Sequence, residues 1–360
     1  MQHANLKFLR NSVILFLLIW CIHQLFILFP ALYEILYLDG LFKIIRILYD
    51  YALGYWLPIP MVVIVFLILL LYLFYPHKSE RTFISVVIRL VSKIFVVLSF
   101  FYIFWGWNYA QKPLSTSLGL EASLKPDSVR LMQEAFWAQA TINSLRSELS
   151  EDTISLSLKD FKKNIVEKEI RNELRSTLSS MNLASTGRPR IRALRPKGAL
   201  LRFKTAGIYV PYAFEGHIDA GMMKIEWPYT IAHEMSHGFG VTDEGACNFI
   251  AFIACMDSEN TIFQYSAMID YTLYVLRDVY RLDKALHRKV YNKLSGGVKA
   301  DIQAIRDNND KYPDILPDIR DYLYDTYLKS HGVSAGLKSY SQLTGLVIQY
   351  KENKGWNLIE

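Results

Sequence analysis

Residues 227–244 read WPYTIAHEMSHGFGVTDE, and within them His233-Glu234-Met235-Ser236-His237 form an HExxH motif. Two histidines four residues apart on a helix project from one face, one turn apart. Both imidazoles can then reach a single Zn²⁺ ion, and Glu234 between them can take a proton from a metal-bound water. The stretch therefore predicts a helix that carries one catalytic zinc ion.

The residues around the motif fit the two ends of such a helix. Trp227 and Pro228 stand upstream, where a helix can begin, and Gly238 and Gly240 stand just beyond the second histidine, where it can stop. We therefore predict a helix over 227–238 and a second one over 244–256.

The third metal ligand is expected shortly after the motif. Gly240 and Asp243 follow the second histidine with the spacing HxxGxxD, in which a glycine turn returns the chain to the metal, and Asp243 can bind through oxygen. In the competing interpretation Asp243 or Thr242 caps the next helix and Glu244, its first residue, faces the metal. We favour Glu244 and keep Asp243 as the alternative; Glu215 and His217 are further candidates.

Other side chains are expected to support the metal or the substrate. Asn248, one turn after Glu244, can hydrogen-bond a ligand histidine and fix its tautomer. The β-rich segment 207–218 can form a strand whose edge takes an extended substrate. Three side chains in this segment are candidates for an oxyanion donor or a substrate contact: Tyr209, Tyr212 and His217. Ordinary packing is the competing interpretation for each of them, and for Tyr271 and Tyr340.

The first third of the chain is strongly apolar. The whole chain is 52% hydrophobic with a mean hydropathy of +0.15, and the excess lies in three runs over 12–30, 57–75 and 84–106. Each run is long enough to cross a bilayer as a helix, which takes about 20 residues. We predict three transmembrane helices. The first resembles a signal peptide, but no small-residue cleavage site follows it, so we interpret it as an uncleaved anchor.

The basic residues predict an orientation. Lysines and arginines flank the first run on its amino-terminal side and occupy the connection between the second and third runs: Lys7, Arg10, Lys78, Arg81 and Arg89. The positive-inside rule then places both regions in the cytoplasm. A multi-pass protein of a bacterial inner membrane, with its catalytic domain on the periplasmic side, is the expected arrangement.

The charge balance excludes one class of partner. Residues 1–106 hold 8 Lys and Arg and 4 Asp and Glu, a net +4, and the rest holds 32 and 30, a net +2. No basic stripe supports nucleic-acid binding. The three cysteines do not form a disulfide framework: Cys21 lies in the first apolar run, and Cys247 and Cys255 are expected to be small buried residues of one helix. The expected partners are a peptide or protein substrate and the lipid bilayer.

The predicted organisation has three parts. Residues 1–106 form the membrane region, with an amphipathic stretch at the interface over 41–50; 107–128 form an extended connector; and 129–360 form a zinc metallopeptidase-like domain. Within this domain one or two strands are predicted in 189–216. Helices are predicted over 129–149, 157–181, 227–238, 244–256, 260–281, 283–295, 314–330 and 335–351. The fold class is a membrane-anchored α+β protein whose mainly helical domain is zincin-like and has a small sheet.

The chain resembles a bacterial membrane family known as domain of unknown function 3810. The resemblance rests on the HExxH with Gly240, Glu244 and Asn248-Phe249, and it extends over nearly the whole chain. Three further segments carry it: Trp105 to Tyr109 with Pro113-Leu114, Gly207 to Tyr212, and Gly336 to Tyr340.

This resemblance implies three spans and a gluzincin-like site. In a gluzincin site a glutamate on the following helix, here Glu244, is the third ligand, and an Asn or Asp one turn later supports a histidine. The sequence departs from the family pattern at Gly238, where a polar residue is usual, and near Ala246, where an acidic one is usual. The resemblance implies no substrate.

The sequence favours a membrane-anchored zinc metalloendopeptidase that hydrolyses peptide bonds with metal-activated water. His233, His237 and Glu244 are the expected ligands, and Glu234 is the expected base. One alternative is a membrane sensor or assembly protein with a structural zinc site, which would usually have four protein ligands. Another is a zinc amidase that acts on cell-wall fragments.

Overall fold

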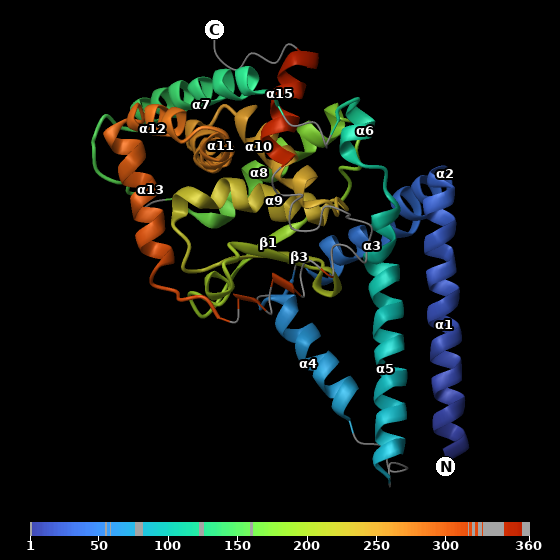
Figure 1. Ribbon diagram of the computed structural model, residues 1–360. Helices are drawn as coiled ribbons and strands as arrows, with labels where there is room; N and C mark the ends of the chain where they lie inside the picture. The colour runs from blue at the N-terminus through green and yellow to red at the C-terminus, as the bar shows by residue number, and fades with distance from the viewer. Residues whose placement is uncertain are drawn as a thin grey trace. The chain divides into compact units, whose positions relative to one another are not determined.

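The chain divides into two compact units. They are described from a computed structural model (Figure 1), which describes residues 2–54, 56–57, 59–75, 82–121, 126–158, 161–315, 317–318, 321–322, 326 and 342–354. The first unit comprises Met1–Lys112 together with Thr186–Arg188 and Val210–Glu215. The second comprises Pro113–Ser185, Pro189–Tyr209 and Gly216–Glu360.

The first unit is built from helices. In chain order they are α1 (Gln2–Leu28), α2 (Pro30–Leu32), the π-helical η1 (Tyr33–Phe42), α3 (Lys43–Leu48), the π-helical η2 (Tyr49–Leu53), α4 (Met61–Phe74), α5 (Phe83–Phe104) and the 3-10 helix η3 (Gly106–Ala110). α1 and α5 lie side by side (Figure 1). Both expose many large apolar side chains, and both are long and apolar enough to cross a membrane.

The prediction of a middle span over 57–75 is wrong. This run forms only α4, whose 14 residues extend about 21 Å at the helical rise, short of the roughly 30 Å hydrocarbon core. Pro60 stands before its first turn. At its other end the Lys93 ammonium donates to the Leu73 and Tyr75 carbonyls at 3.1 Å each. In the described part of the chain two helices, rather than three, pass the test for a span.

The predicted amphipathic stretch over 41–50 buries two of its charged residues, Arg46 and Asp50, and exposes Lys43. Arg46 and Asp50 are 0% exposed and form an ion pair with 2.7 Å between Nη2 and Oδ1. The Arg46 guanidinium also donates to the Phe214 carbonyl at 3.0 Å, and the Asp50 carboxylate accepts from the Arg188 N–H at 2.6 Å. Ile44 on the other side is exposed. This burial is the reverse of a helix that faces water, and it fits an apolar surrounding.

The connector over 107–128 was predicted to be extended. In its described residues it contains helical turns instead. η3 is held in the first unit because the Trp107 indole donates to the Ile19 carbonyl at 3.1 Å. α6 (Leu114–Leu118) follows Pro113 and ends at Gly119, whose φ of +68° a residue with a side chain rarely adopts.

The second unit is mainly helical. Its α-helices after α6 are α7 (Ser128–Leu149), α8 (Lys163–Ser180), α9 (Trp227–Gly238), α10 (Glu244–Met256), α11 (Thr261–Leu282), α12 (Lys284–Asn292), α13 (Gly296–Asn309) and α15 (Leu343–Lys354). Three 3-10 turns connect them: η4 (Leu201–Phe203), η5 (Pro211–Ala213, counted with the first unit) and η6 (Lys224–Glu226). Every residue of α10 is buried. This helix is therefore the centre of the core, with α8, α9 and α11 packed against it.

A small sheet stands beside α9. Its strands are β1 (Arg190–Leu194), β2 (Gly207–Val210) and β3 (Glu215–Asp219), in the order β1-β3-β2. The central β3 is buried at all five positions. Among the described strands β2 therefore lies at an edge of the sheet, and α9 packs against the sheet through β1 (Figure 1).

The structure confirms a mainly helical domain with a small sheet and changes several details. The segment 189–216, predicted to hold one or two strands, holds β1 and β2, and a third strand, β3, begins at its end and runs beyond it to Asp219. α8 begins at Lys163 rather than at 157. α13 was not predicted; Ser295 caps it by accepting from the Val298 N–H at 3.3 Å, so the glycines at its start do not prevent it. Most of the helix predicted over 314–330, and the first part of that over 335–351, lie outside the described residues.

Candidate metal centre

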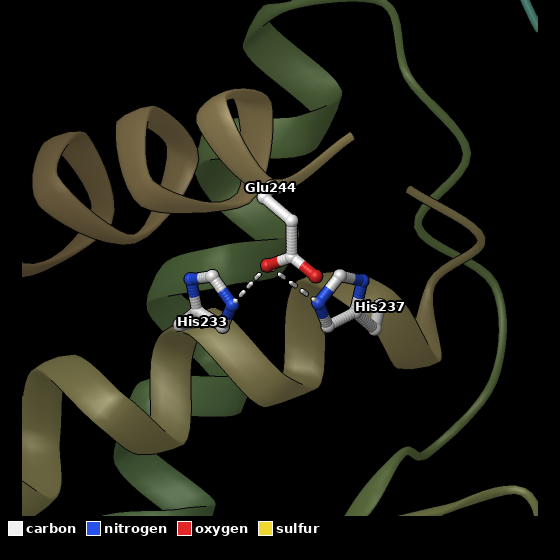
Figure 2. Close-up of side chains that lie close together, drawn as sticks. All are labelled: His233, His237 and Glu244. Carbon is white, nitrogen blue, oxygen red and sulfur yellow. Dashed lines mark hydrogen bonds and ion pairs between the residues drawn. The ribbon is translucent and has the colours of Figure 1, made fainter. Parts of the chain in front are cut away.

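Two consecutive helices of the second unit bring three potential ligands together. His233 and His237 stand one turn apart on α9, with ring centroids 5.0 Å apart. Glu244 is the first residue of α10. Its Oε2 lies 3.1 Å from His233 Nε2 and 3.5 Å from His237 Nε2 (Figure 2). These three side chains point toward one another and form the candidate metal centre.

The turn between the two helices explains how Glu244 reaches the histidines. α9 ends at Gly238, and Gly240 has a φ of +103°, which a residue with a side chain rarely adopts. The Asp243 carboxylate then accepts from the Ala246 N–H at 2.7 Å and caps α10. This short connection brings the first turn of α10 next to His237.

The remaining ring nitrogens of the two histidines face oxygen acceptors. His233 Nδ1 lies 2.9 Å from Asn248 Oδ1, and His237 Nδ1 lies 2.8 Å from the Val241 carbonyl oxygen. The Tyr229 hydroxyl donates to the same Asn248 oxygen at 3.2 Å. A proton on each Nδ1 satisfies these acceptors and leaves each Nε2 lone pair directed at Glu244. This is the tautomer that metal binding requires.

The ligand atoms of the cluster are close enough together to hold one metal ion. The three ligand atoms lie within 4.8 Å of one another. A tetrahedral Zn²⁺ with nitrogen and oxygen ligands at about 2.0–2.1 Å separates neighbouring ligand atoms by roughly 3.3 Å. The distances of 3.1 and 3.5 Å from Glu244 bracket that value. Two imidazoles and one carboxylate are also a donor set that zinc commonly accepts.

Glu234 lies on the same helix as the histidines but outside the three-residue cluster. Its side chain is 5% exposed. Its Oε2 has no hydrogen-bond partner among the residues that the structure describes. Burial, partly opposed by His233 and His237, raises the pKa of Glu234 to about 7. A carboxyl group with this pKa can both accept and return a proton near neutral pH.

The structure separates the other predicted site residues. Tyr209 lies near the cluster, with its ring centroid 6.2 Å from that of His237. Tyr212 belongs to the first unit, where its hydroxyl donates to the Val97 carbonyl at 2.9 Å. His217 is buried in β3, and burial lowers its pKa to about 4. Tyr209 is therefore the one of these three that the described contacts bring to the histidines.

The remaining candidates have other partners. Glu215 accepts from the Met61 N–H at 2.8 Å, and the Tyr271 hydroxyl donates to Glu134 at 2.7 Å. Tyr340 lies outside the described residues. Asp243, Glu215 and His217 are not part of the cluster found among those residues. Cys247 is buried, as predicted, and its sulfur lies 3.4 Å from His237 Nδ1.

Two acidic residues near the site were not singled out from the sequence. Burial raises the pKa of Asp270, on α11, to about 7, partly opposed by His233. Burial and then the Asp270 carboxylate raise the pKa of Glu226, the last residue of η6, to about 8. Asp270 has no spacing relation to the HExxH motif, because α11 reaches α9 only through tertiary packing. Glu226 stands at the amino-terminal end of α9, seven residues before His233.

We predict that Glu226→Gln makes stability less dependent on pH. The pKa of Glu226 is raised from 4.5 to about 8, so the unfolded chain releases its proton at a lower pH than the folded protein. Stability is full below about pH 4.5 and falls as the pH rises toward 8. The variant lacks this loss and should therefore gain stability relative to the parent between pH 5 and pH 8. Thermal unfolding at pH 5 and pH 8 tests this; an equal difference at both would contradict it.

Comparison with known proteins gave one family and no characterised relative. A family model described as "Protein of unknown function (DUF3810)" matches residues 37–348. The match contains α5 and the complete candidate metal centre, whereas α1 lies before its first residue. No curated protein and no solved structure gave a significant match.

Proposed function

Since the chain belongs to the DUF3810 family, whose description names no activity, we propose from the site itself that it is a membrane-anchored, zinc-dependent hydrolase of peptide bonds. The observation that carries the proposal is the cluster of His233, His237 and Glu244 with Glu234 beside it. Structural zinc sites usually have four protein ligands, whereas catalytic sites have three. Three such ligands are found among the described residues, which favours catalysis.

The residues of the site suit hydrolysis. A bound Zn²⁺ would supply Lewis-acid chemistry, polarising a carbonyl group and making water a stronger acid. Glu234, with a pKa of about 7, accepts the proton of the attacking water and returns it to the leaving amine. Asn248 and the Val241 carbonyl hold the two imidazoles in the required tautomer. Tyr209 is the nearest of the candidate oxyanion donors.

The position of β2 supports an extended peptide as the substrate. β2 lies at an edge of the described sheet. Its first residue, Gly207, approaches the Glu234 side chain closely. An edge strand can add an extended segment through main-chain hydrogen bonds. A peptide bound in this way would run beside the acid–base residue, so β2 favours a peptide over other amides.

The two apolar helices support an anchor in a membrane. α1 and α5 are long enough to cross a bilayer, and the polar groups of Lys93 and Arg46 are directed to protein partners rather than outward. We propose that these helices hold the hydrolase at a bacterial inner membrane. With two spans in place of three, the basic residues before α1 no longer assign the metal centre to the periplasmic side.

Metal removal tests the proposal. The full-length protein in detergent should contain one zinc per chain and cut members of a peptide library. Dialysis against a chelator should abolish cleavage, and added Zn²⁺ should restore it. Removal should also lower the melting temperature, because a metal at 1,000 times its Kd stabilises the folded state by about 4 kcal/mol.

The other outcomes separate the alternatives. Zinc that is bound and stabilising, without cleavage of peptides or of cell-wall amides, would replace the hydrolase with a sensor or assembly protein that has a structural site. Cleavage of cell-wall amides alone would make the protein an amidase. A chain without zinc would overturn all three.

A further inference from the structure

Two glycines from neighbouring strands lie against the Glu234 side chain. A Cβ atom built on Gly207, the first residue of β2, would lie 2.6 Å from Glu234 Oε1 and 2.8 Å from its Cγ. A Cβ on Gly216 of β3 would lie 3.0 Å from Glu234 Cβ and would also collide with the Ile191 side chain. Because real Cβ atoms essentially never come within 3.0 Å of another heavy atom, the carboxylate occupies space that a side chain at position 207 would fill.

Space, rather than backbone conformation, excludes a side chain at Gly207. Its φ lies outside the left-handed range, unlike that of Gly240 at +103°. Alanine could therefore adopt the backbone conformation of Gly207 without strain. The collision with Glu234 is then the main obstacle to a larger residue at this position.

Both α9 and the chain that leads into β2 make further contacts near this point. α9 also meets the sheet region at its end, where a Cβ on Gly238 would lie 2.6 Å from Pro189 Cβ. The chain leading into β2 is held by Asp219, whose N–H donates to the Ala206 carbonyl at 3.0 Å. The Asp219 carboxylate, 0% exposed, accepts from four backbone N–H groups: Gly198, Leu200, Leu201 and Gly221. A displaced Glu234 would therefore have to change its own conformation.

We propose that Gly207 is a positioning residue for Glu234. Its missing side chain leaves room for Glu234 Oε1, which a Cβ at position 207 would approach to 2.6 Å. The other carboxylate oxygen, Oε2, has no partner among the described residues. The close packing of Gly207 on Glu234 is a property of the fold. Its consequence for catalysis rests on the proposed peptide hydrolysis.

A double-mutant cycle on stability tests the contact without a substrate. In the full-length parent, Gly207→Ala should lower the melting temperature by about 3–6 °C. This is the shift expected when one extra methyl group is forced into a packed site in a domain of this size. In a Glu234→Ala background, where the colliding atoms are gone, the loss should be at least three-fold smaller.

Gly221→Ala is the matched control. Its Cβ would meet the Tyr312 hydroxyl oxygen at 2.6 Å, the same separation as at Gly207, but it has no Glu234 atom among its nearest neighbours. Its effect on the melting temperature should be equal in the parent and in the Glu234→Ala background. Equal losses for Gly207→Ala in both backgrounds would overturn the proposal.

The kinetic test examines the catalytic consequence. With a peptide that the parent cuts, Gly207→Ala should reduce kcat by about 100-fold, the loss typical of a displacement of about 1 Å in a catalytic group. KM and zinc content should stay within two-fold of the parent, and Gly221→Ala should retain the parent kcat. An unchanged kcat in Gly207→Ala would overturn the positioning role. If the parent cuts no peptide, the proposed function fails, whereas the stability cycle still decides the contact.

Discussion

Replacing Glu234 by glutamine should leave zinc bound and abolish peptide hydrolysis. Glu234 is not one of the three clustered ligand residues, so the metal should stay. Glutamine has nearly the same shape but cannot accept the proton of the attacking water. General acid–base groups contribute about 10²–10⁴-fold to rates, so kcat should fall by about 10³-fold or more. Single-turnover cleavage of a library-derived peptide, with zinc content measured on the same sample, tests this expectation.

The folded state provides the control for this variant. The Glu234 side chain is 5% exposed and its pKa is raised to about 7 by burial. A neutral amide in its place should therefore melt at the same temperature as the parent or higher near pH 8. A folded, zinc-loaded Glu234→Gln protein with the turnover of the parent would remove Glu234 from the mechanism.

Removing the Glu244 carboxylate should release the metal. Glu244 Oε2 lies within 3.5 Å of the Nε2 atoms of both His233 and His237. Even residues that only support a ligand contribute 10–100-fold to metal affinity, so Glu244→Ala should weaken zinc binding by more than about 100-fold. Competition with a chromogenic zinc chelator measures the change. Hydrolysis should be lost in parallel at limiting zinc.

Asp243→Ala is the matched comparison on the adjacent residue. Its carboxylate caps α10 by accepting from the Ala246 N–H. The variant should lose about 1 kcal/mol of stability, the usual contribution of such a cap. Its zinc affinity should stay within a few-fold of the parent. The reverse pattern, with metal lost in Asp243→Ala and kept in Glu244→Ala, would make Asp243 the third ligand.

Much of the candidate centre could be predicted because it is local in sequence. α9 and α10 have the predicted bounds, Trp227–Gly238 and Glu244–Met256. Helix geometry fixes the spacing of side chains four residues apart, and caps mark helix ends. The expected partnership of Asn248 with a histidine also holds in the structure, since His233 Nδ1 lies 2.9 Å from its oxygen. Metal binding by the cluster stays a prediction.

The membrane region was predicted less well because hydropathy does not report how far a helix continues. The run over 57–75 has no charge, yet α4 starts only after Pro60, where an N–H donor is missing. The carbonyl of Leu73, near the end of α4, accepts a hydrogen bond from the Lys93 ammonium, which lies 20 residues further along the chain. That contact depends on how α4 and α5 pack, and no pattern within the apolar run reveals it.

The sequence by itself determined the HExxH helix, the helix that follows it and the apolar first third, because each depends on residues within a few turns of one another. Only the tertiary structure decided that Gly207 lies against Glu234 and that Tyr212 is directed to Val97 rather than to the histidines. These contacts join residues that are far apart in the chain. No fixed helical or strand period relates such residues, so packing alone determines which of them meet.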